Sequence, residues 1–295
     1  MRIKKQPGEV VFDTANVLFM VLLMAATMYP FVHVLMTSFS EASGLMGYNG
    51  FMLLPRGFSA EAYRKVLANP EILRSFVNSV FYVAAGTLLS IVLTLLGGYA
   101  LSRKDLYWKP LITVFLVIPM YFGGGLIPTY LLINSLGMKN SIWAVIIPGC
   151  VGTYNIILAR TNFQSIPAEL EESAVIDGAP HLVVLFRILV PLSLPIIAVM
   201  TLWQAVGIWN SWFGPSIYLT TRRDLWPIQL ILREIMISTK ESATMMVGVT
   251  DISRQYLNET IKNAVAIVSI IPVIAVYPFL QKYFVKGVLV GAIKG

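Results

Sequence analysis

Residues 75–102 read SFVNSVFYVAAGTLLSIVLTLLGGYALS and contain no Asp, Glu, Lys or Arg. A helix needs about 20 mostly apolar residues to cross the hydrocarbon layer of a membrane, so this stretch is long enough to span one. Its centre, Leu88–Leu96, lacks the alternation of apolar and polar residues that is typical of a membrane β-barrel strand. Because only helices and closed barrels satisfy their backbone hydrogen bonds in lipid, the stretch predicts a transmembrane helix.

Five other stretches without charged residues have a similar length. The composition agrees with them, since 57% of the residues are hydrophobic and 13% are charged, whereas about 25% are charged in an ordinary soluble protein. A soluble fold would need six buried helices of membrane length, and helices inside soluble proteins are usually shorter. The sequence therefore predicts an all-α membrane protein, residues 1–295 forming one domain with six transmembrane helices. The five further stretches are residues 14–40, 110–138, 140–159, 188–221 and 263–281.

Basic residues in the short loops predict the orientation, because cytoplasmic loops of membrane proteins carry an excess of Lys and Arg. Six spans place both termini on one side, and this excess predicts that both are cytoplasmic, including a C-terminal tail over residues 282–295. Two longer outer segments follow, residues 41–74 and 222–262. The net charge of +7 fits contact with anionic lipid headgroups. The basic residues on the inner side are Arg2, Lys4, Lys5, Arg103, Lys104, Lys109, Lys282, Lys286 and Lys294.

Helix-breaking residues occur at membrane depth. Gly123, Gly124 and Gly125 interrupt the third span, and several prolines lie inside or beside the others. Breaks of this kind are tolerated where a cavity, water or neighbouring helices satisfy the freed carbonyl groups. Glycine and proline are also common in ordinary helix packing within membranes, so both interpretations stay open.

The inner loop over residues 160–191 has a helix–turn–helix pattern. Ser165 is a candidate helix cap, and Pro167 fits the first turn that follows it. Glu169, Glu171 and Glu172 would then lie near the positive end of that helix. Asp177-Gly178 predicts a turn, after which Pro180 opens a second helix that leads into the membrane.

The spacing of this loop resembles a known family. Glu172-Ser173-Ala174, three residues, Gly178, nine residues, Ile188 and then Pro191 are similar to the signature loop of bacterial ABC importer permeases, E-A-A-x3-G-x9-I-x-L-P. Ser173 replaces the first alanine and Val190 replaces the leucine. The resemblance implies the type I importer permease fold, with a cytoplasmic coupling helix that docks on a separate ATPase. It also implies that Glu172 pairs with a basic residue of that ATPase. The ATPase-coupling residues would be Glu172, Ser173, Ala174, Asp177, Gly178 and Pro191.

Further positions look like carbohydrate importer permeases, and the likeness covers essentially the whole chain. It is nearest to the second permease of the maltose importer and, within that type, to the branch that handles oligosaccharides such as alginate. The segments Met120–Tyr130 and Pro227–Leu230 fit this branch. The resemblance implies a second, different permease, two ATPase subunits that hold ATP and Mg, an external solute-binding protein, and location in the bacterial inner membrane. It also implies that the tail residues Ile293, Lys294 and Gly295 contact the ATPase.

The chain lacks the motifs of other classes. A phosphate-binding loop needs G-x-x-x-x-G-K-[ST], and the chain has no Gly-Lys pair. His33 and His181 are the only histidines and fall in different predicted segments, so no metal cluster or catalytic set is indicated. No basic arm with interleaved aromatic residues indicates nucleic-acid binding. The sequence therefore predicts a non-enzymatic subunit without its own cofactor.

A sugar pathway needs aromatic faces for stacking and amides for hydrogen bonding at membrane depth. For each aromatic candidate, packing between helices or an interfacial position is at least as good an explanation, whereas Gln204 and Asn210 are costly in lipid and are expected to face the bundle interior or a cavity. Asn155 lies close to the inner loop and so has packing as its main alternative. The candidates are Tyr121, Tyr154, Asn155, Trp203, Gln204, Trp209 and Asn210.

The cargo and the energy source have alternatives. The outer residues Arg222, Arg223 and Arg233 favour an acidic oligosaccharide, but they would equally suit contact with a binding protein. A peptide or lipid-like cargo would fit the same architecture. A secondary transporter or channel acting alone would need ionisable residues within its spans, and His33 is the only one in the six stretches.

Overall fold

The computed structural model describes residues 6–46, 48, 50–245 and 256–276. Within these ranges the protein is helical, and pairing of the β type is limited to one isolated bridge between Ser40 and Phe58. The described chain forms two compact units. Of the described residues, the first unit combines those up to Pro70 with those between Glu234 and Ile270, and the second holds Glu71–Arg233 together with residues 271–276.

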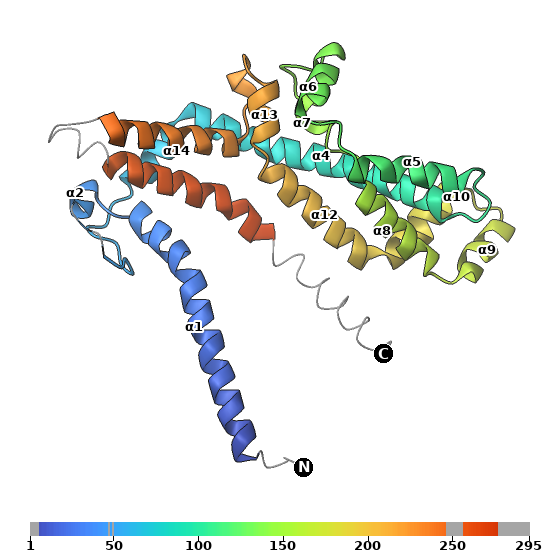
Figure 1. Ribbon diagram of the computed structural model, residues 1–295, viewed down its shortest axis with the longest axis horizontal. Coiled ribbons are helices and arrows are strands. Elements are labelled where there is room, and N and C mark those ends of the chain that lie inside the picture. The colour runs from blue at the N-terminus through green and yellow to red at the C-terminus, as the bar shows by residue number, and fades with distance from the viewer. Residues whose placement is uncertain (1–5, 47, 49, 246–255, 277–295) are drawn as a thin grey trace. The chain divides into compact units, whose positions relative to one another are not determined.

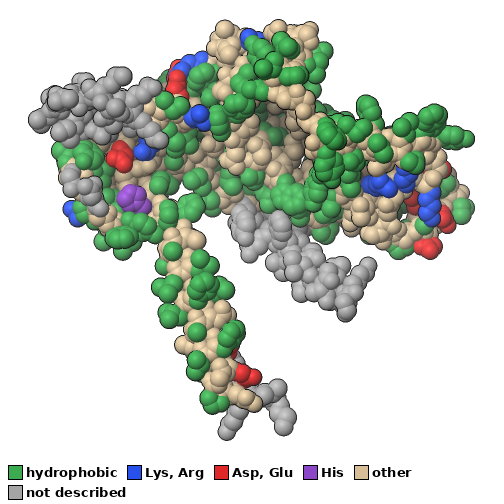
Figure 2. Space-filling model, in the orientation of Figure 1, with side chains coloured by type: hydrophobic (Ala, Val, Ile, Leu, Met, Phe, Trp, Pro, Cys, Tyr) green, Lys and Arg blue, Asp and Glu red, His purple; other side chains and the backbone are tan. Residues whose placement is uncertain are grey.

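The first unit contains the long helix α1 (Pro7–Ser38) and the short helices α2 (Ala42–Leu45) and α3 (Glu61–Ala68). A capping box between Gln6 and Glu9 starts α1. Most of the apolar side chains of α1 are exposed, and Figure 2 shows hydrophobic side chains along its length. A helix with so much exposed apolar surface needs lipid or another chain around it. A further helix, Tyr256–Val276, is apolar enough to cross a membrane.

The second unit is built around α4 (Pro70–Ser102), a helix of 33 residues. Small residues let α8 (Thr153–Gln164) approach it closely, since a Cβ atom added at Gly98 would lie 2.6 Å from the Cβ of Ala159. A hydrophobic cluster around this crossing includes Leu95, Phe163 and Leu185. The cluster packs the C-terminal end of α4 against the inner loop.

Breaks divide the other apolar stretches of this unit. Residues 110–138 form α5 (Lys109–Tyr121) and α6 (Leu126–Ser135), bent by 115° at the glycine triplet. Gly125 has a φ of +84°, which other residues rarely adopt. Residues 140–159 form α7 (Trp143–Ile146) and then α8 rather than one helix, because Pro148, Gly149 and Gly152 lie between them.

The fifth stretch is also bent. The chain runs through α10 (His181–Val183), the π-helix η1 (Val184–Leu189) and α11 (Val190–Leu192), then turns by 88° at Ser193 into α12 (Leu194–Trp209). Pro191 and Pro195 stand on either side of this bend and remove backbone donors there. The remaining elements are α9 (Ala168–Ile176), α13 (Phe213–Tyr218), the short helix η2 (Arg223–Leu225) and α14 (Ile228–Met245).

The number of spans is not fixed by helix length. Among the described residues, three helices are long and apolar enough to cross a membrane, and five segments qualify if each bent pair is one span. The stretch over 140–159 does not count as a span by helix length, since its longer helix, α8, has 12 residues. Six crossings, and the cytoplasmic position of both termini, stay predictions.

Candidate functional site

The inner loop folds as predicted into a short helix, a turn and a second helix. Helix α9 begins after Pro167, which is its N-cap, and Glu169 and Glu171 lie in its first turn. The expectation that Ser165 caps this helix was wrong. Ser165 is the C-cap of α8 instead, and its hydroxyl donates to the Asn162 carbonyl at 2.7 Å. Pro167 has a fixed φ at the N-cap, and no side-chain cap hydrogen bond is found at this end of α9.

The turn at Asp177-Gly178 ends α9 in a Schellman motif. The Gly178 N–H donates to the Val175 carbonyl at 3.0 Å, and the Ala179 N–H donates to the Ala174 carbonyl at 2.9 Å. Gly178 has a φ of +79°, and no neighbouring atom lies within 4 Å of an added Cβ. Glycine is therefore needed for its backbone freedom and not for space.

Two adjacent glutamates of α9 have different surroundings. The side chain of Glu171 is 24% exposed and forms an ion pair with Arg103, which follows the C-terminal end of α4. Glu172 is exposed and makes no hydrogen bond or ion pair with any residue that the structure describes. Neighbours on a helix point about 100° apart, so one carboxylate faces the protein and the other is available to a partner.

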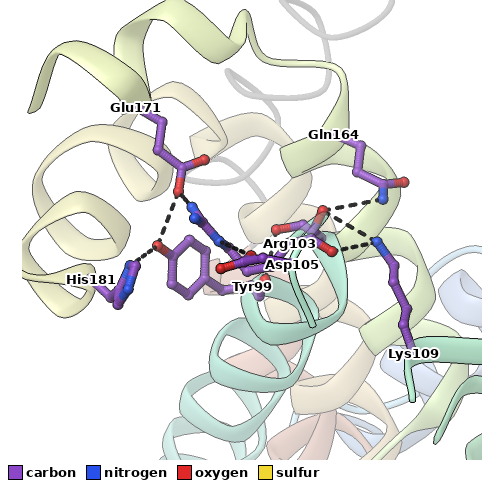
Figure 3. A network of polar contacts seen from close by, with 8 residues as sticks. Tyr99, Arg103, Asp105, Lys109, Gln164, Glu171 and His181 are labelled. Carbon is purple, nitrogen blue, oxygen red and sulfur yellow. Dashed lines mark hydrogen bonds and ion pairs between the residues drawn. The ribbon is translucent and has the colours of Figure 1, made fainter. Parts of the chain in front are cut away.

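Glu171 belongs to a network that joins three elements (Figure 3). The Tyr99 hydroxyl from α4 donates to Oε1 of Glu171 at 3.1 Å, and it lies 3.1 Å from Nδ1 of His181 at the start of α10. The Tyr99 hydroxyl has one proton, which it donates to Glu171, so in the contact with His181 the hydroxyl oxygen accepts and the donor is the N–H at Nδ1. Arg103 also donates to Asp105 at 3.2 Å. The pKa of the Asp105 carboxyl is lowered by its own backbone N–H and by Arg103.

Side chains from two other helices complete the end of α4. Lys109 of α5 donates to the Arg103 carbonyl at 2.6 Å, and Gln164 of α8 donates to the Ser102 carbonyl at 3.4 Å. These donors satisfy carbonyl groups that a helix leaves free at its C-terminus. A recess of about 690 Å³ lies between this end and α9. Its charged lining residues are Arg103, Lys104, Asp105, Glu171 and Glu172.

The other coupling candidates surround this network. Ala174 packs against the hydrophobic cluster of α4 and α8. Ser173 is exposed, and its hydroxyl lies 3.3 Å from the Leu170 carbonyl. Asp177 is the exposed C-cap of α9, and Pro191 lies in α11 before the bend. The tail candidates Ile293, Lys294 and Gly295 lie outside the described residues.

The structure brings together some of the pathway candidates. The rings of Tyr154 and Trp203 lie 6.1 Å apart, and both side chains are about half exposed. The amide of Gln204 donates to the Gly149 carbonyl at 2.8 Å, which satisfies one of the groups freed between α7 and α8. Gln204 also lines a cavity of about 420 Å³, together with residues of α7 and α13.

The remaining pathway candidates have separate surroundings. Trp209 is buried, with its ring edge-on to Phe76 at 5.8 Å, and Asn155 is also buried. Both positions favour the packing interpretation. Asn210 is exposed at the C-cap of α12, and Tyr121 is exposed at the end of α5.

The three outer arginines are not equivalent. Arg222 forms a bidentate pair with Asp224 at 2.8 and 2.9 Å, and the hydrogen bond from Arg222 lowers the pKa of the Asp224 carboxyl. Arg223 pairs with Glu71 at 3.1 Å. The guanidinium of Arg233 instead lies 3.5 Å above the ring of Trp212. Among the three, Arg233 therefore keeps a charge that no described carboxylate neutralises.

Sequence reasoning missed four residues of the network. Tyr99 had no assigned role, and Arg103 was noted only as a basic residue of a loop. Glu171 was assigned to the positive end of its helix, and His181 was considered only as a metal ligand. A spacing pattern within one loop does not show contacts to a helix 72 or 82 residues earlier.

Comparison with known proteins identifies the family. The chain belongs to the family described as binding-protein-dependent transport system inner membrane component, whose model matches residues 86–290. It is similar to the protein LplC of Bacillus subtilis (strain 168), with 38% identity over 97% of this chain and 95% of that protein. The chain is therefore a permease component of an ABC transporter, as the resemblance implied, and not its ATPase.

Two further proteins are similar over nearly their whole length. The polygalacturonan/rhamnogalacturonan transport system permease protein YtcP of Bacillus subtilis (strain 168) is 40% identical over 96% of this chain and 98% of that protein. A chain from the crystal structure of a bacterial ABC transporter that imports the acidic polysaccharide alginate has a TM-score of 0.86 at 28% identity. The similarity covers 96% of this chain and 100% of the chain from the alginate importer. The helical type I importer fold is confirmed.

Proposed function

We propose that this chain forms half of the translocation pathway of an importer for oligosaccharides, with acidic oligosaccharides as the preferred class. The observation that carries the coupling role is the pair of adjacent glutamates on α9. Glu171 is engaged within the chain, whereas Glu172 is exposed on a helix that ends in a fixed turn. An exposed carboxylate on a short helix suits a basic residue of a separate ATPase.

The complex contains a second permease, two ATPase subunits that bind ATP and Mg, and an external solute-binding protein. It lies in the bacterial inner membrane with both termini of this chain in the cytoplasm. Closure of the ATPase subunits on ATP moves α9, and the helices attached to it rock so that the cavity opens outward. The binding protein then delivers the sugar, and hydrolysis returns the cavity to the inward-facing state.

The acidic cargo is supported by the relatives and by one side chain. One relative is assigned to polygalacturonan and rhamnogalacturonan transport, and one similar structure belongs to an alginate importer. Arg233 has its guanidinium on Trp212 and no described carboxylate partner. A guanidinium in this state suits the carboxylate of a uronic acid. Arg222 and Arg223 support this less, because Asp224 and Glu71 already pair with them.

Cargo and coupling are tested together on the reconstituted complex. ATPase activity is measured in lipid with the binding protein and a panel of neutral oligosaccharides, uronate oligosaccharides and peptides. Stimulation by uronate oligosaccharides supports the proposal. Stimulation only by neutral sugars would reject the acidic class, and stimulation only by peptides would reject sugar transport. Uptake driven by an ion gradient without an ATPase would favour a secondary transporter.

The role of Glu172 is tested by Glu172→Ala. The variant is expected to insert and assemble but to lose most sugar-stimulated ATPase activity and uptake, since an exposed carboxylate contributes little to the fold. Glu169→Ala, an exposed glutamate in the same helix, is the control and is expected to retain both. Unchanged uptake in Glu172→Ala would contradict the assigned role.

A further inference from the structure

We propose that Tyr99, Arg103, Glu171 and His181 form a latch that fixes α9 to the end of α4, and that Arg103 and Glu171 are positioning residues for energy coupling. The proposal rests on the proposed function, because it assumes that an ATPase moves α9. It assigns the two neighbouring glutamates different tasks. Glu172 meets the ATPase, and Glu171 transmits the movement within this chain.

The latch is needed because the other contacts of α9 are mainly with η1 and include no buried side chain of α9. No residue of α9 is buried, and Ala174 is the member of α9 that packs against the hydrophobic cluster. The connections at its two ends are short and contain Pro167 and Pro180. A helix held so weakly by apolar contacts would move on its own when a partner displaced it. The polar network supplies the missing connection.

The geometry of the latch favours a firm joint. Oε1 of Glu171 accepts from both Arg103 and the Tyr99 hydroxyl, and the side chains of Arg103 and Glu171 are only about one quarter exposed. Partial burial reduces screening by water and salt, and charge-assisted hydrogen bonds are stronger than neutral ones. Tyr99 is 7% exposed, with its ring in the hydrophobic cluster. The joint is therefore anchored in the core of the second unit.

The element that receives the movement is the long helix α4. Helix α4 has 33 residues, so it is about 50 Å long at 1.5 Å per residue. Its last turn is also held by Lys109 of α5 and Gln164 of α8. His181 extends the network to the start of α10, which leads through η1 toward α12. A displacement of α9 is thus passed to α4 and α10 together (Figure 3).

The experiment compares Arg103→Gln, Glu171→Gln and the double variant in the reconstituted complex. Sugar uptake per ATP hydrolysed is expected to fall at least about fivefold in each, the low end of coupling between distant sites, while basal ATPase activity persists. The double variant is expected to lose no more uptake per ATP than the less active of the two single variants, since all three lack the same Arg103–Glu171 interaction. Lys104→Gln removes a positive charge from the residue next to Arg103 and serves as the matched control.

Hydrogen exchange of residues 168–179 gives a readout that does not depend on transport. The latch predicts faster exchange of these amides in Arg103→Gln than in the wild type and in Lys104→Gln. Unchanged exchange and an unchanged uptake-to-ATP ratio would overturn the latch, and so would an equal loss in Lys104→Gln. A wild-type complex that shows no ATPase coupling would reject the proposed function, while the exchange measurement would still test the joint.

Discussion

The two ends of α4 are both held by polar contacts, but of different kinds. Near its N-terminal end, beyond the exposed ion pair of Glu71 with Arg223, uncharged side chains bond to the backbone of residues 224–228. Asn78 donates to the Asp224 and Trp226 carbonyls at 2.8 and 3.1 Å, and Tyr82 donates to the Leu225 carbonyl at 2.8 Å. At its C-terminal end, Lys109 and Gln164 also bond to backbone carbonyls, but the contacts with α9 join side chain to side chain and include the charged pair Arg103–Glu171.

This difference indicates different tasks for the two ends. Bonds from buried side chains to backbone groups fix a segment permanently, because breaking them leaves buried polar groups unpaired. Tyr82 and Ser79 are both 2% exposed. The side-chain contacts at the C-terminal end instead join α4 to α9, so they can pass a movement of α9 on to α4. The N-terminal end of α4 is thus a static joint, and the C-terminal end is suited to transmitting a movement of α9.

The largest expected effect on stability is at the static joint. Asn78→Leu leaves two carbonyl groups without donors and is expected to lower the free energy of unfolding by about 2 kcal/mol, with uptake per ATP unchanged. The midpoint of thermal unfolding of the solubilised complex measures it. Val77→Ala, at an exposed neighbouring position, is the control and should change it little. A loss of coupling without a loss of stability would reverse the assignment of the two ends.

Gly178→Ala is expected to cost about 1–2 kcal/mol, since it forces a side chain into the left-handed region. The cost comes from the backbone alone, because the site has open space. Gly178→Asn should cost less, since asparagine tolerates this conformation better. The matched control is Gly207→Ala in α12, where there is space and no positive φ. Thermal unfolding and uptake are measured together, and equal behaviour of both alanine variants would contradict the role of the turn.

The same substitution at each end separates the two joints most sharply. Tyr82→Phe is expected to lower stability by about 1 kcal/mol and to leave uptake per ATP unchanged. Tyr99→Phe keeps the ring in the hydrophobic cluster but removes the bonds to Glu171 and His181, so it should lower uptake per ATP with a smaller loss of stability. Identical profiles of the two variants would show that the distinction between the ends is wrong.

The smallest effect is expected from acid at the outer segment. The hydrogen bond from Arg222 lowers the pKa of Asp224. A lowered carboxyl pKa contributes stability above the ordinary aspartate range, and this contribution is lost as the pH falls through the lowered value. Because Asp224 is solvent-exposed, the loss should be slight. Thermal unfolding as a function of pH measures it, and Asp224→Asn should remove this part of the pH dependence. A large pH-dependent loss of stability that Asp224→Asn removes would contradict the expectation that the pair of Asp224 with Arg222 contributes little.

Much of the helical framework could be predicted from the sequence. The apolar stretches over 75–102 and 110–138 correspond to α4 and to the bent pair of α5 and α6, and the glycine triplet marked the bend. The turn at Gly178 could also be predicted, because few residues adopt its backbone conformation. The division of 140–159 into two helices was missed, although Pro148 and Gly149 lie within it. Length without charge indicates membrane depth, but it does not show that one helix continues throughout.

By itself, the sequence determined the helical membrane class, the break at the glycine triplet and the helix–turn–helix of residues 160–191, since these follow from local hydrophobicity, backbone freedom and spacing. The tertiary structure decided which polar residues meet. Glu171 and Glu172 are chemically identical neighbours, and only the packing of α9 beside α4 turns the first toward Arg103 and leaves the second exposed. Likewise, Tyr99 meets His181 across 82 residues because the hydrophobic cluster brings α4 and η1 together. Such contacts depend on the fold of the whole unit, and no local pattern records them.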